Sequence, residues 1–149
     1  MGLDATGGKA VQQDNCAITD VKQTDTGLRF TCLAKALPYP IQRGTEPALK
    51  LVPFIEKMNQ EILRVQGLAA GNYALLIDGQ EVGVYEAKAL QQGINLAVNA
   101  KTPQYKQAQD VAKVNDQRHG VEAGSIRNIV ASERRIRKGD ADLDDPAVR

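Results

Sequence analysis

The chain has 149 residues, of which 42% are hydrophobic and 25% are charged, and its formal net charge is +1. These fractions are typical of folded globular domains, so they exclude a chain that is disordered throughout. No apolar run approaches the roughly 18 residues that a membrane span requires, and we expect no targeting signal in this sequence. A net charge near zero gives no general attraction to nucleic acid, so we expect no nucleic-acid partner.

Few residues are available for metal or cofactor chemistry. The sequence has one histidine and two cysteines. A structural zinc site needs about four clustered ligands, and the spacing of Cys16, Cys32 and His119 matches no zinc finger or ribbon. A run of aspartates between residues 140 and 145 lacks the glycine and the final glutamate of a calcium-binding loop. The sequence therefore predicts no metal site and no cofactor.

The first third of the chain has the pattern of short strands. We expect strands at residues 9–12, 17–22 and 28–33, and the turn sequence TDTG at residues 24–27 joins the last two into a hairpin. A hairpin centred near Thr26 places Asp20 opposite Cys32, so that Cys16 lies about four residues, or roughly 13 Å, further along. A disulfide needs Cα atoms within about 7 Å, so this spacing favours two free thiols. A disulfide remains the alternative if the two strands do not pair directly.

The middle of the chain alternates between helical and strand patterns. Apolar residues at positions 49, 52, 55 and 58 predict a helix near 48–60, with Pro53 near its start or kinking it. Residues 62–65 are typical of a strand. Asp78 and Gly79 lie between two apolar runs, residues 72–77 and 80–85, and this dipeptide predicts a tight hairpin. A single helical turn follows over residues 87–92 and ends at Gly93.

After residue 100 the pattern becomes helical. Thr102 can cap a helix that begins at Pro103 and extends to about Gln117, and Gly120 and Gly124 separate it from a second helix. We therefore expect an α+β fold, a small antiparallel β-sheet or sandwich with one inserted helix and a C-terminal helical segment. The expected domains are a strand-rich domain over 1–100 with a helix near 48–60, a helical C-terminal segment over 101–139 and a polar tail over 140–149.

Four stretches in the middle of the chain occur in a recognisable order. They are LRFT leading to KALPYP (28–40), LKLVPF leading to Asn59 (49–59), VQGLAAGNY with IDG and VG (65–83), and AL, GINLA and TP (89–103). This series resembles the region that follows the catalytic domain in bacterial SGNH/GDSL-type hydrolases, and the resemblance spans about residues 9–119. The catalytic blocks of that family precede this region, and the Gly-Asp-Ser nucleophile block is absent from the chain.

The resemblance implies a function without catalysis for this chain alone. We expect a non-catalytic accessory or interaction domain of an exported SGNH/GDSL hydrolase-like, esterase-like bacterial protein, periplasmic or extracellular. No position of this chain is then catalytic, and the partner is a catalytic domain of the same parent protein or another chain. The parent itself can be a hydrolase. The non-repetitive loops give the candidate interface residues, which are Pro38, Tyr39, Pro40, Ile94 and Asn95.

Two other functions remain open at this point. The first is a stand-alone glycan-binding or protein-binding domain, although the six aromatic residues are scattered and do not form a stacking series. The second is a compact serine esterase that uses Asp116, His119 and Ser125. The Asp-x-x-His spacing at residues 116–119 resembles the motif that ends the SGNH catalytic domain, but no oxyanion motif accompanies Ser125.

Overall fold

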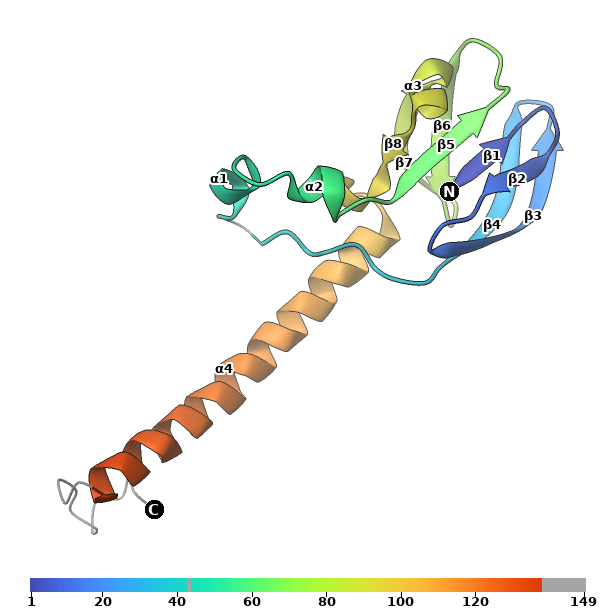
Figure 1. Ribbon diagram of the computed structural model, residues 1–149. Helices are drawn as coiled ribbons and strands as arrows, with labels where there is room; N and C mark the ends of the chain where they lie inside the picture. The colour runs from blue at the N-terminus through green and yellow to red at the C-terminus, as the bar shows by residue number, and fades with distance from the viewer. Residues whose placement is uncertain (43, 138–149) are drawn as a thin grey trace. The chain divides into compact units, whose positions relative to one another are not determined.

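The computed structural model describes residues 1–42 and 44–137, and the chain divides into two compact units, Met1–Gln109 and Asp110–Arg149. The first unit holds every strand found among the described residues (Figure 1). Its largest sheet has the strand order β2-β1-β5-β8, with β1 at Gly2–Asp4, β2 at Lys9–Gln12, β5 at Ile62–Gln66 and β8 at Ile94–Asn95. The pairs β1–β2 and β5–β8 are antiparallel, whereas β1 and β5 are parallel.

Two antiparallel hairpins complete the strands of this unit. The first joins β3 (Cys16–Thr24) to β4 (Gly27–Ala34), and the second joins β6 (Asn72–Ile77) to β7 (Gln80–Glu86). In the second hairpin Asp78 and Gly79 have φ angles of 51° and 78°. A two-residue turn with positive φ at both positions matches the twist of the flanking strands, so this hairpin confirms the one predicted from the sequence. The combination of small, mostly antiparallel sheets with helices confirms the α+β class.

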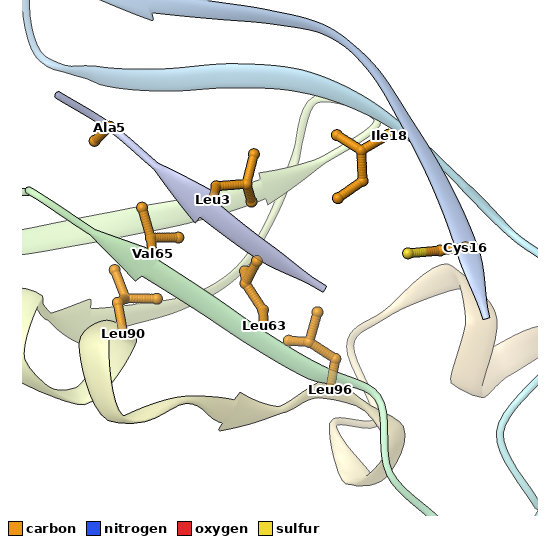
Figure 2. Packing of buried hydrophobic residues seen from close by; sticks show 8 residues of the cluster. All are labelled: Leu3, Ala5, Cys16, Ile18, Leu63, Val65, Leu90 and Leu96. Carbon is orange, nitrogen blue, oxygen red and sulfur yellow. The ribbon is translucent and has the colours of Figure 1, made fainter. Parts of the chain in front are cut away.

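The hydrophobic core is built around the β1–β5 strand pair. Along β5 the side chains alternate, so that Leu63 and Val65 are buried and their neighbours are not. Leu3 of β1 pairs with Val65 and is fully buried. Figure 2 shows the whole cluster of eight buried residues, Leu3, Ala5, Cys16, Ile18, Leu63, Val65, Leu90 and Leu96. The core is therefore assembled from segments that are far apart in the sequence.

Short helical segments connect the strands. The predicted helix near 48–60 is wrong in its extent, since the structure has two four-residue helices, α1 (Glu46–Leu49) and α2 (Phe54–Lys57). Pro53 is the N-cap of α2, and its ψ of 55° is a non-helical value. A continuous helix is unfavourable at this position because proline has no backbone N–H to donate and its ring clashes with the preceding turn. The turn α3 (Ala87–Gln92), which ends at Gly93, confirms its prediction. A 3₁₀ turn, η1 (Leu96–Val98), follows β8.

One continuous helix, α4 (Pro103–Arg137), replaces the two helices that we expected in the C-terminal segment. Gly120 and Gly124 both lie inside it, so glycine does not break the helix here. Two exposed ion pairs at i,i+4 spacing support it, Arg118 with Glu122 at 3.8 Å and Arg137 with Glu133 at 2.7 Å. Among the described residues no helix has both the length and the apolar content to cross a membrane. The predicted polar tail at 140–149 lies outside the described residues.

Candidate functional site

Two loops that the sequence marked as candidate interfaces are joined through one buried side chain. Asn59, which is 1% exposed, lies just after α2. Its Oδ1 accepts a hydrogen bond from the Tyr39 backbone N–H at 2.9 Å, and its Nδ2 donates to the Tyr39 carbonyl at 3.1 Å. This paired contact imitates one rung of a β-ladder and fixes the extended segment that contains Pro38 and Pro40.

Asn95 connects the second loop to the same point. Its Oδ1 accepts hydrogen bonds from the backbone N–H groups of Glu61 at 3.0 Å and Ala97 at 3.1 Å, and its Nδ2 donates to the Asn59 carbonyl at 3.0 Å. The structure therefore brings Tyr39, Asn59 and Asn95 into one network, which we call the asparagine junction. Because the Asn95 amide is used within the chain, its role here is to fix the loops.

The remaining interface candidates differ in exposure. The Tyr39 side chain is 53% exposed, and its ring packs edge-on against Phe54 with centroids 5.6 Å apart. Pro38 and Pro40 are half-buried beside it. Ile94 is half-buried in β8, where it pairs with Leu63 of the core sheet. Of these five residues, Tyr39 presents the largest accessible surface to a ligand.

A cavity of about 500 Å³ lies beside the asparagine junction. Tyr39 and Asn59 form part of its wall, and charged side chains from Asp14, Glu61 and Arg64 also line it. This volume falls in the range of pockets that hold small organic molecules, roughly 300–1,000 Å³. The cavity thus combines an accessible aromatic ring with polar groups of both charges, and its lining is more polar than that of most small-molecule sites.

Glu61 is the most unusual electrostatic group in this cavity. Its Oε1 accepts a hydrogen bond from Gln104 Nε2 at 3.5 Å, whereas its Oε2 is buried and has no partner among the described residues. The Oε1 of Gln104 is buried without a partner as well. Burial raises the pKa of the Glu61 carboxyl above its usual value of 4.5. Sequence spacing alone did not mark Glu61, because the residues that enclose it come from distant segments.

The two cysteines are free thiols, but they lie closer together than the sequence predicted. Cys32 lies opposite Ile18, and Cys16 lies opposite Ala34, so the cysteines are diagonal neighbours two residues apart along the ladder. The free thiols confirm the prediction, but the predicted pairing of Asp20 with Cys32 was wrong by two residues. The turn pairs Thr24 with Gly27, which shifts the register by one residue, and the bulge between Thr19 and Lys22 shifts it by one more. Burial, together with the neighbouring Cys16, raises the pKa of the Cys32 thiol to about 11.

The candidate triad of Asp116, His119 and Ser125 lies entirely on α4, and the structure does not bring it together. All three side chains are exposed, and the Ser125 hydroxyl donates a hydrogen bond to the Val121 carbonyl at 3.0 Å. His119 and Ser125 are six residues apart, which places them about 9 Å apart along the axis and on different sides of the helix. A nucleophile and its base must lie within hydrogen-bonding distance, so α4 by itself does not form this triad.

The chain matches no protein-family model, and it matches no curated protein. It is similar to a solved structure described as "BT4096 a gut microbial diltiazem-metabolizing enzyme", with 41% sequence identity and a TM-score of 0.80. The match covers 87% of this chain and 31% of that protein, so the chain spans about a third of its length. Because α4 contains 35 of the 149 residues, a match over 87% of the chain includes part of α4.

This similarity corrects the expectation that the chain alone is not an enzyme. The solved structure that it resembles at 41% identity is named as a metabolizing enzyme, and the chain corresponds to 31% of that enzyme. The chain thus has a bacterial, enzyme-like fold.

Proposed function

We propose that this chain works in a bacterial enzyme that metabolises small organic molecules, and that the cavity beside the asparagine junction holds part of the substrate. The observation that carries this proposal is the 41% identity to the diltiazem-metabolizing enzyme over 87% of the chain. Sequence identity at this level supports a shared fold over the matched third of that enzyme, and we extend it to a shared type of activity. The size and the mixed polarity of the cavity are consistent with a small-molecule substrate.

Within this proposal the enzyme is of the SGNH/GDSL esterase-like kind, and its substrates are small esters. The support is the ordered series of segments between residues 28 and 103, which resembles the region beside the catalytic domain of such hydrolases. In this enzyme the substrate lies in the cavity of this chain, with the Tyr39 ring at the cavity wall and the asparagine junction keeping that wall rigid. Export of the enzyme from the bacterial cytoplasm belongs to the same proposal.

The test measures binding and turnover with the purified chain. Diltiazem and p-nitrophenyl acetate are titrated into isotopically labelled protein, and their consumption is followed by mass spectrometry and absorbance. We expect chemical-shift changes at Tyr39, Asn59 and Glu61, and consumption above that in buffer. Tyr39→Ala is expected to weaken binding about fivefold, since a packed aromatic contact contributes about 1 kcal/mol.

The matched control is Leu51→Ala, because Leu51 is 85% exposed and lies outside the cavity wall. This control is expected to leave binding and turnover unchanged. The Tyr39→Ala variant keeps the backbone atoms that bond to Asn59, so its fold is expected to remain intact. Shifts confined to other surfaces, or neither binding nor consumption of either compound, would contradict the proposal.

A further inference from the structure

Three sulfur atoms from separate segments lie together in the first unit. Cys16 begins β3, Cys32 lies in β4, and Met1 immediately precedes β1. The Cys32 and Met1 sulfur atoms are 3.8 Å apart. Cys16 and Cys32 are diagonal neighbours on the β3–β4 ladder, because Cys16 pairs with Ala34 and Cys32 pairs with Ile18. The fold therefore assembles a sulfur cluster, defined as Met1, Cys16 and Cys32, which the sequence spacing does not reveal.

The ligand chemistry of the sulfur cluster is that of a soft metal ion. Thiolate and thioether sulfur favour Cu(I), whereas carboxylate and carbonyl oxygens favour hard cations. Three ligands in a trigonal plane, with metal–sulfur bonds of about 2.3 Å, hold neighbouring sulfur atoms about 4 Å apart. The 3.8 Å between Cys32 and Met1 fits this spacing. A structural zinc site has a different requirement, since it takes four ligands in a tetrahedron.

The surroundings of the sulfur cluster are suited to holding such an ion. Cys16 is 8% exposed, and Figure 2 shows its sulfur directed from β3 into the side of the core where Leu63 and Leu96 lie. On this side the core side chains shield the Cys16 sulfur from water. Cys16 and Met1 also line the cavity, which gives a metal ion a path of entry.

We propose that Met1, Cys16 and Cys32 bind one Cu(I) ion. Each thiol releases its proton to the solvent as a sulfur–copper bond replaces the sulfur–hydrogen bond, and the Met1 thioether contributes a lone pair. Copper enters and stays as Cu(I), so no electron is transferred. Nothing in this proposal depends on the proposed enzyme function, because binding needs no turnover.

The first test is a competition for copper with reduced protein in the absence of oxygen. Bathocuproine disulfonate forms a coloured Cu(I) complex, so loss of its absorbance reports transfer of copper to the protein. We expect transfer of one equivalent, and we expect Cys16→Ser and Cys32→Ser each to lower the affinity for Cu(I) at least tenfold. Met58→Leu is the control for the thioether, because Met58 is 61% exposed at the cavity wall, and it is expected to bind copper normally. Tyr39→Ala is expected to bind copper normally too, because Tyr39 lines the same cavity but supplies no sulfur ligand.

The second test needs no substitution and so does not depend on whether the serine variants fold. X-ray absorption on the copper-loaded chain is expected to show only sulfur ligands, with a coordination number of three. A shell of nitrogen or oxygen ligands would overturn the proposal. So would failure of the chain to remove copper from the chelator, or an unchanged affinity in a folded variant that lacks both cysteines.

Discussion

Replacing Glu61 with glutamine is expected to stabilise the first unit at neutral pH. Glu61 Oε2 and Gln104 Oε1 are both buried acceptors without a donor among the described residues. A glutamine at position 61 removes the buried charge, and its amide group can donate a hydrogen bond to Gln104 Oε1. An unsatisfied buried polar group costs about 1–3 kcal/mol. Because Glu61 is only half-buried, we take the lower limit and expect a gain of about 1 kcal/mol in the free energy of unfolding, or about 4–8 °C in Tm for a unit of this size.

The dependence of this gain on pH tests its cause. Burial raises the pKa of Glu61 in the folded state above the unfolded value of 4.5, so the folded protein holds this proton more tightly than the unfolded protein does. The ionised carboxylate therefore destabilises the fold above the raised pKa, and this cost disappears as the pH falls below 4.5. A protonated Glu61 can also donate to Gln104. The advantage of glutamine is thus expected to be largest near pH 7 and to vanish near pH 4.

Urea unfolding followed by circular dichroism at pH 7 and pH 4 measures both effects. Glu56→Gln is the matched control, because Glu56 is an exposed carboxylate in the neighbouring α2 and its substitution is expected to change stability by less than about 0.5 kcal/mol. If Glu61→Gln destabilises the protein at pH 7, or stabilises it equally at both pH values, the burial argument is refuted.

Three further predictions follow from the packing. Leu63→Ala is expected to lower the free energy of unfolding by about 2–5 kcal/mol, because Leu63 is 1% exposed in the core sheet; a loss below 1 kcal/mol in urea unfolding would contradict this. Gly79→Ala is expected to lower the free energy of unfolding by about 1–2 kcal/mol, since φ at this position is +78°. Gly120→Ala is expected to raise the helicity of α4, because open space surrounds this position. Thermal unfolding measures the first effect and the ellipticity at 222 nm the second, and a stabilising Gly79→Ala or a less helical Gly120→Ala would contradict the reasoning. Asn95→Ala removes three hydrogen bonds and is expected to speed amide exchange at Glu61 and Ala97 at least tenfold, which unchanged exchange in NMR spectra would disprove.

The features that the sequence predicted well are local ones. The β6–β7 hairpin depends on Asp78 and Gly79, whose backbone preferences set the turn wherever the hairpin lies in the fold. The end of α3 at Gly93 is equally local, because the φ of 106° at this position is available to glycine and strained for other residues. Such signals act within a few residues and need no knowledge of tertiary contacts.

The features that sequence reasoning missed depend either on contacts between distant residues or on free-energy differences of only about 1 kcal/mol. The asparagine junction connects positions 39, 59 and 95, and no spacing pattern indicates that three loops meet there. The bulge in β3 shifts the register by a single residue, which the alternation of side chains alone does not locate. Gly120 and Gly124 each cost a helix only about 1 kcal/mol, too little to end α4, although both looked like breaks in the sequence.

The parallel pairing of β1 with β5 has a consequence for how the protein is made. Leu3 and Val65 lie side by side in the same sheet although 61 residues separate them. During synthesis the ribosome adds about 5–20 residues per second, so β1 waits several seconds before its partner strand emerges. Throughout that interval β1 can pair only with β2, and the β3–β4 hairpin between β1 and β5 can already have formed. The order of translation therefore favours hairpins first and closure of the central sheet afterwards.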